Sequence, residues 1–131
     1  MSNPAPIKIV KVRLNGRGEV FLEIDAPPSE EFMEGFKRYW HKPATYSSGF
    51  DHRVFDRFEG TAIVFTPMPV EEFENNHLGV AKDAVDAANK FVVEVYKGRD
   101  EEQAAREKAK GAQEELLEAE RAKAERIKFD P

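Results

Sequence analysis

Five side chains have the chemistry for acid–base catalysis or metal binding: His41, Asp51, His52, Asp56 and His77. Imidazole exchanges a proton near neutral pH, and two imidazoles with carboxylates can hold zinc. The spacing argues against both uses. The chain has neither a His-x-x-x-His nor a His-Glu-x-x-His motif. Asp51 and His52 are adjacent, so on a strand they would face opposite ways. We therefore expect no metal site and no cofactor.

Other catalytic motifs are missing from the sequence as well. The chain has no Cys, which excludes a disulfide scaffold, a thiolate zinc site and a thiol nucleophile. It also lacks a G-x-S-x-G motif, a Walker loop and a G-x-G-x-x-G motif. A hydrolase that uses the His and Asp side chains stays open as an alternative, but the sequence favours a non-catalytic protein.

The densest cluster of side chains that could bind a ligand lies in residues 36–58. This segment holds seven of the 14 aromatic residues and has a net charge of +3, whereas the whole chain has a net charge of −5. Rings that stack on unpaired bases, with cations that contact phosphates, are typical of single-strand nucleic-acid binding. The basic residues of the segment are Lys37, Arg38, Lys42, Arg53 and Arg57.

The same segment also fits a protein interface, because exposed aromatic rings and arginines are enriched at interface hot spots. Several of these rings must also supply the core. The interpretation therefore depends most on Trp40, which is its best anchor only if the ring is exposed. We predict that a partner is bound by Arg38, Tyr39, Trp40, Tyr46, Phe50, Arg53 and Arg57.

The N-terminal elements that position this segment are predicted to be two strands and a helix. Residues 7–14 and 19–26 alternate between apolar and polar, and the Asn and Gly residues between them favour a hairpin turn. Ile9 and Val10 break the alternation, which predicts a bulge there or a strand buried on both faces. Ser29 is a good N-cap for a helix over residues 30–41.

Two more strands and two helices are expected after this helix. Residues 53–58 and 61–66 have strand character, and the second is apolar on both faces, as in a central strand. Apolar residues then recur at helical spacing over 77–97, and Gly98 should end that helix in the left-handed conformation. A charged helix over 101–128 follows, either folded back as an αα-hairpin or projecting as an arm. Its thin apolar stripe consists of Ala105, Ala109, Ala112, Leu116 and Ala119.

The expected architecture is α+β in the order β-β-α-β-β-α-α, with a four-stranded, mostly antiparallel sheet, helices on one face and a long charged C-terminal helix. Of the 31 Leu, Ile, Val and Phe residues, 27 lie in the first 100 positions. We therefore predict a core domain over 1–98 and a separate charged helix over 99–131. No signal sequence or long apolar run is found, so we expect a cytoplasmic protein that does not enter the membrane.

Taken together, these patterns favour a small non-catalytic binding or regulatory protein, of an accessory or mobile-element kind, that contacts a protein partner. The contacts would come from residues 36–58 and from the charged helix. Two alternatives stay open. One is single-stranded nucleic-acid binding through residues 36–58, and the other is an oligomeric structural subunit that assembles as a coiled coil through the stripes in 78–95 and 105–119.

Overall fold

A computed structural model describes residues 5–127 of the chain. Its contacts divide these residues into two units, one that ends at Val95 and one that begins at Tyr96. We call residues 5–95 the globular unit and residues 96–125 the charged segment. No helix within residues 5–127 is both long enough and apolar enough to cross a lipid bilayer.

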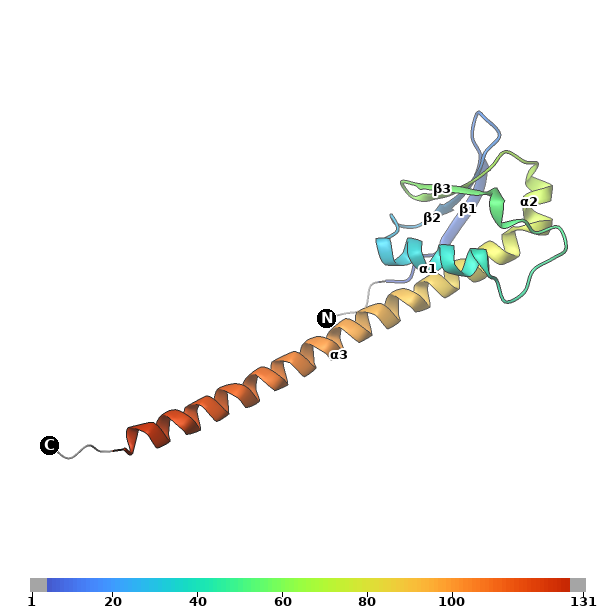
Figure 1. Cartoon of the computed structure of the whole chain (residues 1–131). Coiled ribbons are helices and arrows are strands. Elements are labelled where there is room, and N and C mark those ends of the chain that lie inside the picture. The colour runs from blue at the N-terminus through green and yellow to red at the C-terminus, as the bar shows by residue number, and fades with distance from the viewer. Residues whose placement is uncertain (1–4, 128–131) are drawn as a thin grey trace. The chain divides into compact units, whose positions relative to one another are not determined.

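The globular unit contains a four-stranded sheet in which every pair of neighbouring strands is antiparallel (Figure 1). The strand order is β1-β2-β4-β3, so the apolar fourth strand is central, as predicted, and all its residues are buried. The predicted α+β class and four-stranded sheet are therefore confirmed. The strands are β1 (Ile9–Leu14), β2 (Val20–Ile24), β3 (Phe55–Glu59) and β4 (Ala62–Phe65).

The turn between β1 and β2 has the conformation that its residues favour. Gly18 has a φ of 78°, which a residue without a Cβ adopts readily. The Asn15 Oδ1 atom accepts hydrogen bonds from the backbone N–H groups of Arg17 (3.0 Å) and Glu19 (2.9 Å). The side chain of Asn15 thus closes the hairpin from inside the loop.

Both edge strands are irregular. The register between β1 and β2 shifts between Ile9 and Lys11, which confirms the predicted bulge. A second shift, which the sequence did not predict, lies between Phe55 and Arg57 in β3. Because of this shift, the rings of Phe55 and Phe58 lie together, with centroids 5.3 Å apart, and both contact helix α1.

Helix α1 (Glu30–His41) has the predicted bounds, and the Ser29 side chain accepts a hydrogen bond from the Phe32 N–H at 3.1 Å. A 3-10 turn (His52–Val54) precedes β3. Helix α2 (Val70–Asn76) follows Pro69 and was not predicted as a separate element.

Helix α3 (Leu78–Glu125) is continuous, so the predicted helix end at Gly98 is wrong. Of the glycines in the described residues, Gly18 and Gly60 have positive φ and Gly98 does not. A glycine inside a helix costs only about 1 kcal/mol relative to alanine, which the good helix formers around it offset. The turn that an αα-hairpin would need is not formed there. The two helices expected over 77–97 and 101–128 are therefore one helix, and His77 divides it from the unpredicted helix α2.

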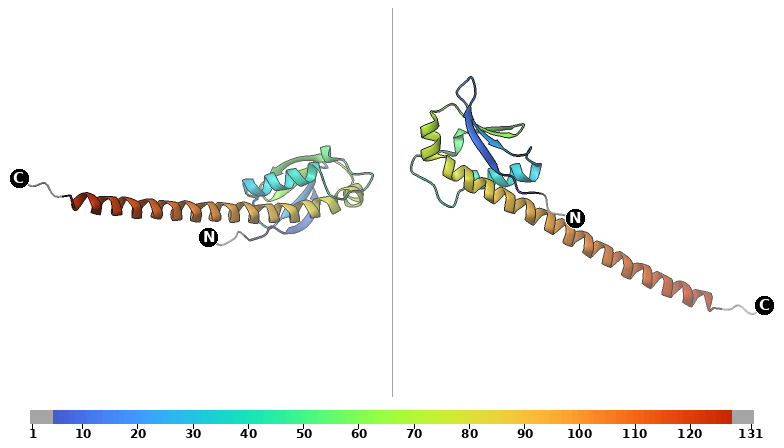
Figure 2. Two further views of the ribbon diagram at one scale, coloured as in Figure 1. Left: turned by 60° about the horizontal axis from the view of Figure 1, so that its bottom comes forward. Right: turned by 180° about the vertical axis from the view of Figure 1, so that it is seen from behind.

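The core of the globular unit is rich in aromatic rings. Phe36 of α1 stacks on Trp40, with ring centroids 5.7 Å apart, and Phe65 of β4 contacts Phe73 of α2 at 4.9 Å. Helix α1 runs beside the first part of α3 (Figure 2). A Cβ atom on Gly35 would lie only 2.9 Å from the Cβ of Phe91, so the two helices are in close contact.

A side chain of α3 also ties down the chain before β1. The Oδ1 atom of Asn89 accepts a hydrogen bond from the Ile7 N–H at 2.8 Å, and its Nδ2 donates to the Ile7 carbonyl at 2.9 Å. The amide therefore pairs with both backbone groups of Ile7, as a neighbouring strand would.

Candidate functional site

Trp40 is buried, so the prediction that it anchors an exposed binding surface is wrong. Its side chain has 0% exposure, and its Nε1–H donates to the backbone carbonyl of His52 at 2.7 Å. The reason is helical spacing: Phe32, Phe36 and Trp40 follow one another at intervals of four residues and share the face of α1 that turns to the core.

The other rings of residues 36–58 are divided between core and surface. Phe36 is buried in the core, and the half-buried rings of Phe55 and Phe58 contact it and each other. Tyr39 and Phe50 are half-buried. Tyr46 is 65% exposed, and its ring lies 5.7 Å from that of Phe50. Of the predicted aromatic anchors, Tyr46 is thus the one that is mainly on the surface.

The arginines predicted to bind a partner each face a carboxylate of the chain itself. Arg38 pairs with Glu34 at 2.5 Å, one helical turn away. Arg53 pairs with Asp51 at 3.0 Å. Glu34 lies outside residues 36–58 and offsets part of their net positive charge, whereas Asp51 is already counted in it.

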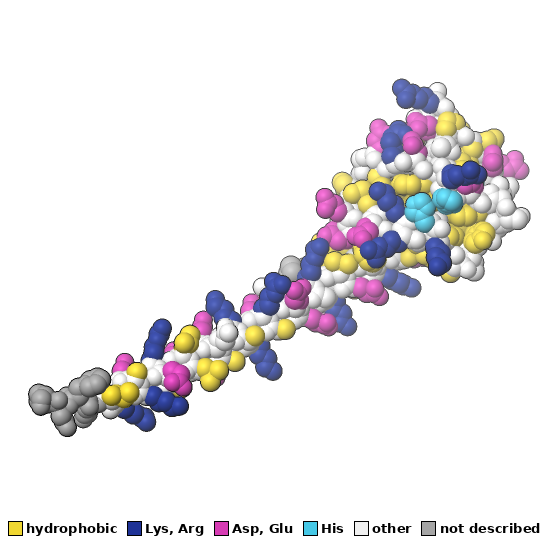
Figure 3. Space-filling model, in the orientation of Figure 1, with side chains coloured by type: hydrophobic (Ala, Val, Ile, Leu, Met, Phe, Trp, Pro, Cys, Tyr) yellow, Lys and Arg dark blue, Asp and Glu magenta, His cyan; other side chains and the backbone are white. Residues whose placement is uncertain are grey.

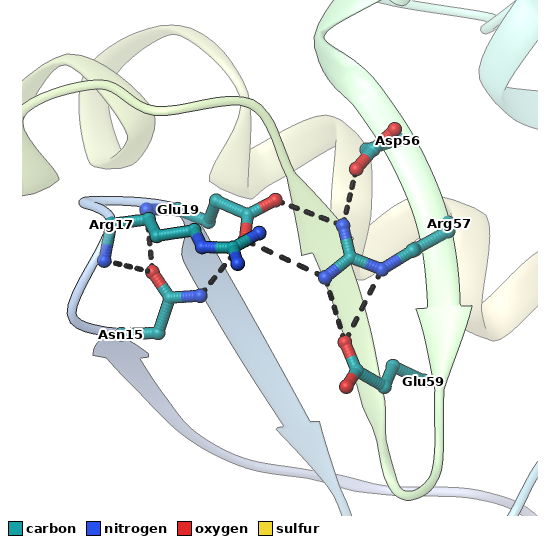
Figure 4. A network of polar contacts seen from close by, with 6 residues as sticks. All are labelled: Asn15, Arg17, Glu19, Asp56, Arg57 and Glu59. Carbon is teal, nitrogen blue, oxygen red and sulfur yellow. Dashed lines mark hydrogen bonds and ion pairs between the residues drawn. The ribbon is translucent and has the colours of Figure 1, made fainter.

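Arg57 is the centre of a polar network on the sheet (Figure 4). Its guanidinium pairs with Glu19 at 2.8 Å and Glu59 at 2.7 Å, and also with Asp56. The hydrogen bonds from Arg57, and then the one from Asn15, hold the pKa of Glu19 below its usual value. These contacts give Arg57 a structural role in the sheet, and its predicted contact with a partner stays a prediction.

This network bridges strands that are not neighbours. Arg57 lies opposite Val64 of β4, and β4 separates β3 from β2. A small buried cluster lies in the two central strands and consists of Phe21 of β2 with Ala62 and Val64 of β4. Arg13 covers the other end of that cluster, with its guanidinium carbon 4.3 Å from the Phe21 ring centroid. Sequence analysis missed this arrangement, since Glu19 and Arg57 are 38 positions apart.

A pocket of about 890 Å³ remains at the loop between α1 and β3, with His41, Tyr46 and His52 in its lining. The rings of His41 and His52 lie 5.3 Å apart, and Figure 3 shows histidine side chains together on the surface. Lys42 and Arg53 also line it. Asp51 lines the same pocket, so the structure brings together three of the five residues considered for acid–base chemistry.

The carboxylate nearest to this pair has another role. Asp51 accepts hydrogen bonds from the backbone N–H of Arg53 at 2.9 Å and from its guanidinium at 3.0 and 3.1 Å. The guanidinium, followed by the backbone N–H, lowers the pKa of Asp51 to about 2. Asp51 is therefore a fixed anion that caps the 3-10 turn.

Within residues 5–127, no group of three or more His, Cys, Asp or Glu side chains is placed to hold a metal ion.

The third histidine, His77, lies between α2 and α3, with 2% exposure. Its ring is 5.7 Å from that of Phe50 and 6.3 Å from that of Phe73. Burial lowers the pKa of His77, although the charges of Glu72 and Asp51 act in the opposite direction. His77 is thus a buried ring of the core.

The two apolar stripes of α3 have different environments. In the globular unit, Ala81, Val85 and Val92 are buried, so the stripe in 78–95 is not available for oligomerisation. From Tyr96 to Ile127, no residue is buried. Leu116 and Leu117 are 68% and 56% exposed, and Figure 3 shows charges of both signs along this helix.

Comparisons with known proteins give no family for this chain: no family model matches it, and no match was found among curated proteins or solved structures.

Proposed function

We propose that the protein is a non-catalytic binding module, of an accessory or regulatory kind, that contacts another protein through the charged segment. The observation that supports this proposal most directly is the exposure of Leu116 and Leu117 on a helix with no buried residue. Helices of globular proteins are stabilised mainly by packing of their apolar face, so an exposed leucine pair favours a partner.

The energetics support the same conclusion. The pair between Glu102 and Arg106 (2.5 Å) is exposed, and such a pair stabilises a helix by only about 0.2–0.5 kcal/mol. Burial of one leucine side chain contributes about 1.5–3 kcal/mol. Leu116 and Leu117 lie beside Gln113 and Glu120 on the surface of this helix, where a side chain of the partner can contact them.

Residues 36–58 supply a smaller second contact in this proposal. Tyr46 is the exposed ring, and Tyr39 and Phe50 are half-buried beside the core. Arg38 and Arg53 can contact a partner while they stay paired with their carboxylates, since both side chains are mainly exposed.

The test compares Leu116→Glu with Ala104→Glu in the full chain. Both changes add one negative charge to the charged segment, but Ala104 lies outside the apolar stripe. Partners are captured from the source cells by cross-linking and identified by mass spectrometry. We expect Leu116→Glu to lose a partner that the wild type and Ala104→Glu both retain. An identical set of partners for all three proteins would refute the proposal.

Single-stranded nucleic-acid binding is the second candidate, and the loop pocket favours it. The exposed ring of Tyr46 adjoins Lys42, His41 and His52 in the pocket lining. Binding there should weaken with salt, with log K falling by about 0.7 per neutralised phosphate for each unit of log salt. Fluorescence anisotropy with a labelled oligonucleotide tests this, with Tyr46→Ala as the variant. No binding at low salt rejects the candidate.

A further inference from the structure

Charged residues of opposite sign lie beside the apolar stripe of the charged segment, seven positions apart. Along the stripe that contains Ala105, Ala112 and Leu116, the residues on one flank are Lys108 and then Glu115, seven positions later. In paired helices, residues on the flanks of the seam face the flanks of the other helix and decide its orientation. The signs of Lys108 and Glu115 therefore predict which orientation of a second helix is favoured.

The two orientations place these charges differently. In a parallel pair of identical helices, Lys108 faces the neutral Gln113 of the other copy, and Glu115 faces its Glu120, which repels it. In an antiparallel pair, the same flanks face each other, so that Lys108 of each copy meets Glu115 of the other. A parallel pair also has two attractive contacts, between Glu101 and Arg106, which offset its two repulsive ones. The antiparallel arrangement has the two attractive contacts of Lys108 with Glu115 and no repulsive contact between these flanking residues.

We propose that two copies of this chain pair through their charged segments in antiparallel orientation, with Lys108 of each opposite Glu115 of the other. This inference rests on the proposed function, in which another helix covers the apolar stripe of the charged segment, and adds a second copy of the chain as one such helix. In this register, Leu116 lies opposite Ala105 of the other copy, and Ala109 lies opposite Ala112. Large side chains thus meet small ones, which lets the helices approach closely.

The length of the helix fits the same register. On the seam, facing positions have numbers that add to 221, whereas the flanking pair of Lys108 and Glu115 adds to 223. At this register Tyr96 is level with Glu125. These residues are the first of the charged segment and the last of α3. The register selected by charge and side-chain size therefore also pairs the whole segment from end to end, over about 45 Å at 1.5 Å per residue. The apolar stripe itself covers only residues 105–119, about two heptads, so we expect the paired helices to associate weakly.

The test measures the mass of the full chain in solution over a range of concentrations, by sedimentation equilibrium. We expect a dimer that dissociates on dilution. Lys108→Glu and Glu115→Lys should each weaken the dimer by roughly tenfold, because each change places like charges at both contacts. A 1:1 mixture of the two variants should associate as strongly as the wild type, because both contacts of the mixed dimer are attractive again. Lys110→Glu, which lies away from the seam, is the matched control.

The outcomes separate this inference from the proposed function. A monomer at every concentration overturns the antiparallel dimer, and so does a dimer that Glu115→Lys strengthens, since that is the result expected of a parallel pair. A mixture of variants no stronger than either alone also overturns it. Failure in any of these ways leaves the proposed function to its own test, because the Leu116→Glu comparison measures binding to a different protein. Circular dichroism confirms that each variant keeps its helix content.

Discussion

The globular unit and the charged segment are stabilised by different interactions. In the globular unit, Phe32, Phe36 and Trp40 of α1 have exposures of 1% or less, and the rings of Phe36 and Trp40 contact β3 and β4. In the charged segment, no residue is buried, and its side chains form ion pairs, a hydrogen bond and a contact of the Arg99 guanidinium with the Tyr96 ring. Packing therefore stabilises the globular unit. The charged segment is stabilised by helix propensity and by any partner that covers its apolar stripe.

The largest effect is expected from Phe36→Ala. Phe36 is fully buried and contacts Trp40, Phe55 and Phe58, so its removal leaves a cavity and should lower the free energy of unfolding by about 3–5 kcal/mol. Urea unfolding followed by the fluorescence of Trp40, the only tryptophan, measures the globular unit alone.

Leu116→Ala is the control for this prediction. Because Leu116 is exposed, its truncation should change the same unfolding transition by less than about 0.5 kcal/mol. If both substitutions lowered the free energy of unfolding by similar amounts, the two regions would unfold as one packed structure.

Replacement of a glycine by alanine should have opposite effects on stability in the two regions. In Gly35→Ala, the new Cβ would lie 2.9 Å from the Cβ of Phe91, which forces α1 and α3 apart and should cost about 1–3 kcal/mol. In Gly98→Ala, the new Cβ meets nothing within 4 Å, so the change should stabilise the helix by up to about 1 kcal/mol.

The two glycine variants are measured by different signals. The urea midpoint from Trp40 fluorescence should fall for Gly35→Ala, whereas the helical circular dichroism at low temperature should rise for Gly98→Ala. A fall in helix content in the second variant would mean that Gly98 is not helical in solution.

A pH-dependent loss of stability is expected from His77. Because the pKa of His77 is lowered by burial, the unfolded chain binds this proton more readily than the folded chain does. The contribution of neutral His77 is therefore complete above the usual pKa of about 6.5 and is lost as the pH falls through that value towards the folded-state pKa.

His77→Phe should flatten the stability profile between about pH 7 and pH 5. His41→Phe is the control, because His41 is exposed and should leave the slope unchanged. Chemical denaturation at several pH values measures the slope. A slope that survives in His77→Phe would assign it to other groups.

The smallest effect is expected from Arg106→Gln in the charged segment. This change removes the pair with Glu102 and should reduce helix stability by about 0.2–0.5 kcal/mol at low salt. The difference in helical circular dichroism should vanish near 1 M salt, where the screening length is about 3 Å. A difference that persists at high salt would point to packing rather than charge.

The sheet and α1 were predictable because their signals are local. The alternation in residues 19–26 follows from a strand with side chains on two faces, and the Asn and Gly residues of the turn have few alternatives. Ser29 and the proline after α1 mark its ends. Helix α2 has only seven residues, too few to show a period, and the small penalty of Gly98 was outweighed by the helix on both sides of it.

The candidate site was less predictable, because it depends on contacts between distant residues. The intervals from Phe32 to Phe36 and from Phe36 to Trp40 indicated burial of Trp40, but Tyr39 competed with Trp40 for the same stripe. The carboxylates that neutralise Arg57 include Glu19, which directly precedes β2. Composition counts charges along the chain, whereas the surface depends on which charges meet in space.

The amide of Asn89 also constrains the order in which the protein can fold during synthesis. Ile7 emerges from the ribosome early, and the side chain that pairs with its backbone follows 82 residues later. The backbone of Ile7 therefore stays without this partner while most of the globular unit is still being made, next to an edge strand in which Val10 is 60% exposed. The bulge at Val10 and the charges of Lys8 and Lys11 protect this edge from pairing with a neighbouring nascent chain before Asn89 arrives.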